Sequence, residues 1–170
     1  MQFSDFYTDN HNFVNYSAEH YLSILVVIAL GIWFLYVGKY KCSHERRWSI
    51  AIILAAVLYA LQLFKTFIRL YLGNFNITED LPLHLCNLLP LLMIIGLSSR
   101  CRPILAVIFF WILGGTVQAN ITPVLLDTFP HYDAIRYWGV HTGLPFLAIY
   151  LVYVLNYRFT VSDAILSALS

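Results

Sequence analysis

The chain has 170 residues, of which 60% are hydrophobic and 11% are charged, and its formal net charge is +1. A soluble globular domain carries roughly 25% charged residues, so this composition excludes an ordinary soluble domain and favours one small membrane bundle. No basic patch or run of like charge is present, so nucleic acid is not an expected partner. Residues 1–20 are polar and acidic, unlike a cleavable signal peptide, and are predicted to form an extracytoplasmic N-terminal segment.

Five apolar segments follow, and a bilayer crossing needs roughly 20 such residues. They cover residues 21–38, 48–71, 81–97, 103–126 and 137–157, and residues 161–170 read as the start of a further helix with Ser162 as its N-cap. The runs are continuous and lack the alternation of barrel strands, so helices are predicted. The expected fold class is all-α: a polytopic bundle with a five-helix transmembrane domain over 21–158 and the start of a further helix over 159–170.

The loops predict an orientation, because short cytoplasmic loops are enriched in lysine and arginine. Loop 39–47 contains four of these residues and loop 98–102 contains two, whereas residues 1–20 and 72–80 contain none. Arg136, in loop 127–136, is the one exception to this alternation. The N-terminus of an integral membrane protein is therefore predicted to lie outside and its C-terminal residues in the cytoplasm.

Several costly polar residues fall at nearly one depth, close to the outer ends of the predicted spans. They are His20, Lys65, Arg69, His84, Cys86, Gln118, Asn120 and His141. Ionisable groups inside a span are expensive and mark functional sites by default, so one polar pocket near the outer leaflet is predicted. Simpler roles stay open: Lys65 and Arg69 can reach the headgroups, His20 can be interfacial, and Gln118 and Asn120 can bond neighbouring helices.

Cys86 is the candidate nucleophile of this pocket. His84 is two residues away and so lies on a nearly opposite face of a regular helix, which makes His141 in the fifth span the better partner. A neighbouring imidazole lowers the pKa of a thiol and yields a thiolate nucleophile. Such a pair suits acyl transfer or ester hydrolysis, with Gln118 or Asn120 donating to the developing oxyanion.

The remaining pocket residues suggest what is bound. Lys65 and Arg69 are four residues apart and share a helix face, which suits the phosphate or carboxylate of a lipid headgroup. Membrane lipids are therefore the expected partners, and no cofactor or metal is assigned. Two alternatives remain: a ligand-binding or transport protein without catalysis, and an intramembrane zinc hydrolase using His20, His84, His141 and Cys86.

Three stretches of the chain resemble the YwaF-like integral membrane family, which includes bacterial YwaF proteins and the animal transmembrane protein 164. These are LPLHLCNL at 81–88, GGTVQANITP at 114–123 and YWGVH at 137–141, accompanied by His131 and by the 13–20 entry to the first span. The resemblance implies a cysteine-dependent lipid acyltransferase. It also implies similarity in architecture to the androgen-induced membrane hydrolases, which act on lipid esters. Cys86 takes the nucleophile position and His141 the histidine position.

The same resemblance implies a bacterial cytoplasmic membrane and a longer chain, with one or two further helices after the fifth span. Ser170 lies inside what reads as the next helix. The chain is therefore expected to be a short form, a truncated product, or a subunit that completes its pocket by forming a homo-oligomer.

Overall fold

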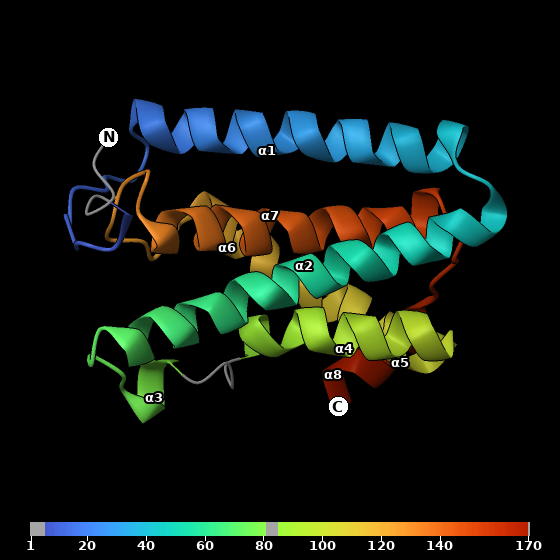
Figure 1. The fold of residues 1–170 in the computed structure, drawn as a ribbon. Helices are drawn as coiled ribbons and strands as arrows, with labels where there is room; N and C mark the ends of the chain where they lie inside the picture. Colours follow the sequence, from blue (N-terminus) through green and yellow to red (C-terminus); the bar gives the residue numbers. More distant parts are fainter. Residues whose placement is uncertain (1–5, 81–84, 170) are drawn as a thin grey trace.

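The computed structural model describes residues 6–80 and 85–169, and every regular element in this part of the chain is a helix (Figure 1). The predicted all-α fold class is confirmed there. The elements are α1 (Ala18–Tyr36), the π-helical turn η2 (Val37–Lys41), α2 (His44–Tyr71), α3 (Ile77–Asp80), α4 (Leu85–Ser99), α5 (Arg102–Trp111), the π-helical turn η3 (Ile112–Thr116), α6 (Val117–Ile121), α7 (Tyr132–Tyr153) and α8 (Val161–Leu169).

Three helical stretches are long and apolar enough to cross a membrane: Ala18–Lys41, His44–Tyr71 and Arg102–Ile121. Only His20 and Gly31 are buried within α1, so most of its apolar surface faces outward, as a lipid-exposed helix requires. α4 is shorter, with 15 residues. α7 has 22 residues but carries charged groups in its first turns. These features support a membrane location.

Several predicted boundaries differ from the structure: α1 begins three residues and α2 four residues earlier than predicted, and α7 ends four residues earlier. Two further differences have a clear local cause. The fourth span ends at Ile121 rather than at residue 126, because Pro123 lacks an amide hydrogen and restricts Thr122 to a non-helical conformation. The fifth helix begins at Tyr132, five residues earlier than predicted, with His131 as its N-cap. Hydropathy hid this first turn and a half because Asp133 and Arg136 are polar, although both lie on the helix.

α7 is the central helix of the bundle. It lies between α1 and α2, while α4 packs along the other side of α2 (Figure 1). Close approach depends on glycine: a Cβ on Gly31 of α1 would lie 2.3 Å from the ring of Phe146, and one on Gly143 would lie 2.8 Å from Leu58. The main apolar core lies where these helices meet and includes the fully buried Met93, Leu105, Leu144 and Leu147.

α8 docks on α5 through a polar contact. Asp163 accepts two hydrogen bonds from Arg102, at 2.9 and 2.8 Å, and two from the backbone and hydroxyl of Thr160, at 2.6 and 2.8 Å. The Arg102 guanidinium and these Thr160 donors hold the pKa of Asp163 below its usual value. The Asp163 amide also bonds back to the Thr160 hydroxyl, so Thr160, rather than the predicted Ser162, caps α8 in a reciprocal capping box.

The N-terminal segment folds over the loop that precedes α7. Asp127 accepts hydrogen bonds from the backbone amides of Asn10 (2.7 Å) and His11 (2.9 Å). Burial alone would raise the pKa of Asp127. These two amides, together with His131 and His11, lower the pKa by more than burial raises it, so the net shift is downward. The amide of Phe13 bonds the carbonyl of Leu126 at 2.8 Å, which continues this contact toward α1.

Candidate functional site

The helix ends that carry the predicted pocket residues lie at one end of the bundle, where α1 and α7 begin and α2 ends (Figure 1). Within this end, however, the side chains form separate clusters instead of one pocket. His84 lies outside the described residues.

His20 holds helices together. It is 1% exposed. Its Nδ1 accepts a hydrogen bond from the Tyr16 amide (2.9 Å), and its Nε2 lies 3.1 Å from the Asn120 carbonyl, to which it donates. Its ring stacks on Tyr21 and lies 5.3 Å, between centroids, from Trp138. Both ring nitrogens are engaged, so neither is left for a lipid or for the zinc ion of the alternative interpretation.

Asn120 is a second helix tie, between α6 and α7. Its Nδ2 donates to the backbone carbonyls of His141 (2.7 Å) and Thr116 (2.9 Å), and its Oδ1 accepts from the Thr142 hydroxyl (2.6 Å). An amide has two N–H donors, and both are used. Asn120 therefore has no donor for an oxyanion in this arrangement, and its position matches the interhelical role that the sequence left open.

Gln118 is exposed on α6, and its amide donates to the Thr122 hydroxyl one turn later, at 3.2 Å. The contact is local to this stretch of chain. The structure does not bring Gln118 to Cys86 or His141.

His141 is 8% exposed and is fixed from one side. Its Nδ1 lies 3.1 Å from the Tyr137 carbonyl, to which it can only donate, and its ring stacks on the Tyr137 ring with centroids 4.3 Å apart. A neutral imidazole that donates through Nδ1 carries its lone pair on Nε2. That nitrogen makes no hydrogen bond to the described part of the chain, so its lone pair is available.

Cys86 is half-buried in the first turn of α4. Among the described residues, its thiol makes no hydrogen bond to His141. What the two share is Tyr137, whose ring stacks on His141 and whose phenol lies within electrostatic reach of the Cys86 sulfur. The Tyr137 hydroxyl donates to the Ala119 carbonyl at 2.8 Å and accepts from the Val124 amide at 3.2 Å, which fixes the ring between them.

A polar network beside Cys86 was not predicted. Arg136 donates to Asp133 (2.9 Å) and to Gln62 (3.0 Å), and Gln62 donates to Asn87 (2.8 Å), the residue after Cys86. Arg69 joins it through a longer contact with Asp133, at 3.4 Å. The network links α2, α4 and α7. Two signals could have revealed it: Arg136 breaks the loop-charge alternation, and Gln62 is a polar residue in an apolar run.

The two predicted headgroup cations are placed differently by the structure. Arg69 is 23% exposed at its side chain and pairs with Asp133. Lys65 is half-buried one turn earlier on the same face of α2. Arg136 contacts the same carboxylate, so two guanidinium groups lie beside Asp133.

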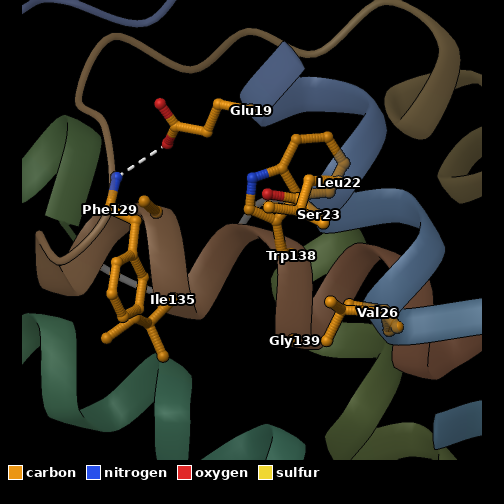
Figure 2. Close-up of a pocket in the computed structure, with 10 residues that line it drawn as sticks. Glu19, Leu22, Ser23, Val26, Phe129, Ile135, Trp138 and Gly139 are labelled. Carbon is orange, nitrogen blue, oxygen red and sulfur yellow. Dashed lines mark hydrogen bonds between the residues drawn. The ribbon is translucent and has the colours of Figure 1, made fainter. Parts of the chain in front are cut away.

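An apolar groove lies between α1 and α7, with a volume of about 660 Å³ (Figure 2). Residues from α1, α7 and the preceding loop line it, among them Glu19, Leu22, Ser23, Val26, Phe129, Ile135, Trp138 and Gly139. Glu19 accepts a hydrogen bond from the Phe129 amide at 2.8 Å. The indole Nε1 of Trp138 is buried and has no hydrogen-bond partner among the described residues. Neither Cys86 nor His141 lines this groove.

Comparison with known proteins gives one match. The model of the TMEM164 family matches residues 15–170, which confirms the resemblance carried by the three motifs. No curated protein and no solved structure matches the chain.

Proposed function

We propose that this chain, which belongs to the TMEM164 family, is an integral membrane enzyme that acts on lipid esters, either as an acyltransferase or as a hydrolase. Cys86 is the nucleophile and His141 the general acid and base. The observation that carries this proposal is the fixed imidazole of His141, whose Nδ1 donates to the Tyr137 carbonyl and leaves Nε2 as the proton acceptor.

The reaction needs two half-steps. His141 Nε2 takes the thiol proton while the Cys86 sulfur attacks the acyl carbonyl, and the departing alcohol then receives that proton as the ester C–O bond breaks. An acceptor alcohol, or water, next gives its proton to His141 and attacks the thioester. The C–S bond breaks, and the departing Cys86 sulfur receives that proton from His141. The Cys86 side chain must turn toward Nε2 for the first step, because the two are not hydrogen-bonded in the described arrangement.

The guanidinium groups beside Asp133 support a lipid substrate with an anionic headgroup. Arg69 and Arg136 both contact the carboxylate of Asp133, and Asn87 connects this network to the turn that bears Cys86. Guanidinium groups bind phosphate oxygens with short, charge-assisted hydrogen bonds. We infer that the phosphate lies near Arg69 and Arg136 while the ester reaches Cys86.

The topology that fits this function has five crossings. α4 and α7 would add to the three long apolar stretches, with residues 1–20 outside, 21–158 in the membrane domain and 159–170 beginning a further helix. Arg136 is a weaker exception to the loop-charge rule than its position suggested, because its guanidinium bonds Asp133 and Gln62. The proposed location is a bacterial cytoplasmic membrane, with homo-oligomerisation as one way to complete the pocket.

Labelling in native membranes tests the chemistry. A lipid-like, thiol-reactive acyl probe would be applied to the wild type, Cys86→Ala and His141→Gln, with Cys101→Ala as the matched control for a half-buried thiol elsewhere. We expect Cys86→Ala to abolish labelling, His141→Gln to slow it at least tenfold, and Cys101→Ala to leave it unchanged. Equal labelling in all variants would refute the Cys86–His141 enzyme.

A second candidate function, lipid binding without catalysis, is favoured by the groove between α1 and α7. An acceptor on a bound lipid could satisfy the Trp138 indole, whose buried N–H lacks a partner in the described chain. A photoactivatable phospholipid should crosslink to this groove, and Trp138→Phe should reduce that crosslinking while keeping an aromatic ring. If the lipid crosslinks to the groove while the acyl probe does not label Cys86, lipid binding without catalysis is favoured over the enzyme.

A further inference from the structure

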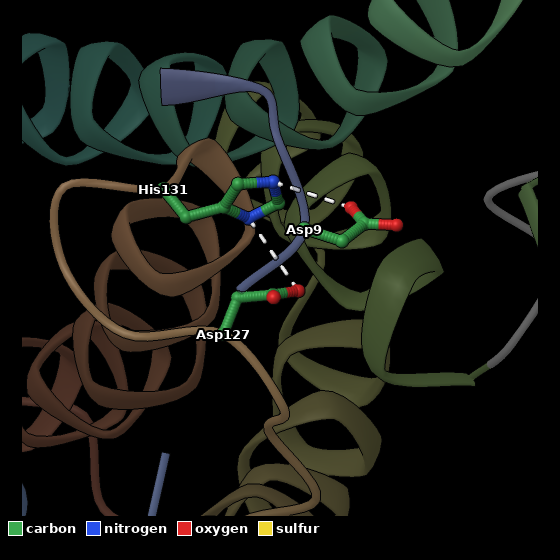
Figure 3. Close-up of side chains that lie close together, drawn as sticks. All are labelled: Asp9, Asp127 and His131. Atoms are coloured by element: carbon green, nitrogen blue, oxygen red, sulfur yellow. Dashed lines mark ion pairs between the residues drawn. The ribbon is translucent and has the colours of Figure 1, made fainter. Parts of the chain in front are cut away.

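Three side chains with metal-binding atoms converge away from Cys86 and His141, where the N-terminal segment meets the start of α7 (Figure 3). Asp9 comes from the segment, Asp127 from the loop before α7, and His131 from the N-cap position of α7. His131 Nε2 lies 3.5 Å from Asp9 Oδ1, and its Nδ1 lies 3.6 Å from Asp127 Oδ2. The ligand atoms of all three lie within 4.8 Å of one another.

The imidazole of His131 provides an independent sign of a missing ligand. Its side chain is 0% exposed, and its Nε2 has no hydrogen-bond partner among the described residues. Buried polar atoms are nearly always hydrogen-bonded, so an exception calls for an explanation such as an ion. The 3.5 Å separation from Asp9 exceeds the usual range of an N–H···O hydrogen bond, so Asp9 does not meet this need directly. The other ring nitrogen, Nδ1, accepts a hydrogen bond from the Asp133 amide at 3.3 Å. An ion bound at Nε2 would require the ring hydrogen to move to Nδ1, where Asp127 Oδ2 lies 3.6 Å away.

We propose that Asp9, Asp127 and His131 bind a divalent transition-metal ion such as Zn²⁺. Imidazole nitrogen and carboxylate oxygen are ordinary zinc ligands. Two carboxylates and a neutral imidazole carry two negative charges, which a divalent ion neutralises. Side-chain oxygens and nitrogens that share one tetrahedral zinc ion lie about 3.4 Å apart, given bonds of about 2.0 to 2.2 Å, and the observed 3.5 Å between Nε2 and Asp9 Oδ1 is close to this value.

The site is open on one side. The Asp9 side chain is 43% exposed, so water can fill the remaining coordination position and the ion can enter from solvent. His11 is 3.7 Å from Asp127, but its side chain is 61% exposed, and it is not in the converging group. The positive end of the α7 dipole opposes a cation here, and the two carboxylates have to outweigh it.

A bound ion would fasten the N-terminal segment to the bundle. Asp9 is in that segment, whereas Asp127 and His131 flank the turn that leads into α7. The segment already rests on Asp127 through the amides of Asn10 and His11. The ion would therefore add a crosslink between two parts of the chain more than a hundred residues apart, and its role is structural.

Metal binding to the full chain tests the proposal. The protein would be reconstituted in nanodiscs, stripped with a chelator and titrated with Zn²⁺ alone, with bound zinc measured by mass spectrometry and thermal stability measured in parallel. We expect one zinc ion per chain and a rise in Tm on binding. Asp9→Asn and His131→Gln should each weaken zinc binding at least tenfold, while His44→Gln, an exposed histidine at the start of α2, should not.

Asp9→Asn is the more informative variant, because the Asp9 side chain is 43% exposed and lies 3.5 Å from His131, so the apo fold should survive. An unchanged apo Tm in this variant, with zinc binding lost, supports a site. Absence of zinc binding in the wild type, or equal binding in all variants, overturns the proposal.

Discussion

Arg136 donates a hydrogen bond to the side-chain oxygen of Gln62 across 3.0 Å, and this contact joins α7 to α2. Gln62 is 2% exposed and the Arg136 side chain 14%. The residue that breaks the loop-charge rule is thus a structural cation, held by Asp133 and Gln62. Asn87 accepts a hydrogen bond from Gln62 and so extends the same network to the first turn of α4.

Arg136→Met should destabilise the protein by about 3 kcal/mol, because it takes the arginine donor from the buried Gln62 oxygen and removes the shorter of the two arginine contacts to Asp133. The free energy of unfolding in detergent or bicelles measures this change. Arg46→Met is the control, since Arg46 is exposed in the first turn of α2 and should change stability by less than about 0.5 kcal/mol. Equal effects of the two substitutions would show that the network adds nothing.

Asn120→Ala should cost about 1 to 3 kcal/mol, because the carbonyl of His141 and the hydroxyl of Thr142 lose a buried partner. The loss should also loosen the backbone around His141, which hydrogen exchange of α7 amides would detect. Gln118→Ala, two residues earlier on an exposed face, should be close to neutral in both measurements. A larger effect at Gln118 than at Asn120 would contradict the placement of these two side chains.

Gly31→Ala should destabilise the bundle by about 1 to 3 kcal/mol, because the added Cβ would lie 2.3 Å from the Phe146 ring and force α1 away from α7. Gly114→Ala is the matched control, since nothing lies within 4 Å of its Cβ position. There the higher helix propensity of alanine should be neutral or stabilising by up to about 1 kcal/mol. Thermal unfolding of both variants tests the close packing of α1.

Acid should weaken the docking of α8. The pKa of Asp163 is lowered in the folded protein, chiefly by its hydrogen bonds from Arg102 and then from Thr160. A lowered carboxyl pKa gives a stability contribution that is present above the unfolded value of about 3.9 and is lost as pH falls through the folded pKa. The Tm difference between wild type and Asp163→Asn should therefore be constant near neutrality and narrow below about pH 4. A gap that stays constant down to pH 2 would assign the effect to packing alone.

The candidate site was only partly readable from the sequence. The depth argument placed His20, Arg69, Cys86 and His141 at one end of the bundle, because helix rise per residue is fixed. Rotation about each helix axis was not fixed by that argument. His20 and Asn120 therefore turned out to bond neighbouring helices, and Gln118 to face outward, whereas Gln62 and Arg136 turned inward to one network, and the pattern of a single span could not show that the two side chains meet.

The cluster of Asp9, Asp127 and His131 could not be predicted from the sequence either, because its members are far apart in the chain. Asp9 and Asp127 are 118 residues apart, and no local spacing connects them. Their meeting depends on the N-terminal segment folding back over the loop before α7, which hydrogen bonds from Asn10 and His11 to Asp127 bring about. His131 was visible in the sequence as part of a family motif, but its orphaned Nε2 could be recognised only in the fold.

The sequence by itself determined that the chain is helical, apolar and suited to a membrane, because those properties follow from continuous hydrophobic runs whose backbone must bond internally. It also determined the family, through motifs at 81–88, 114–123 and 137–141. Only the tertiary structure decided which polar side chains meet: Arg136 with Gln62, Asn120 with His141, and His131 with Asp9 and Asp127. These pairings depend on helix rotation and chain reversal, and both are set by packing between distant segments, such as Gly31 against Phe146.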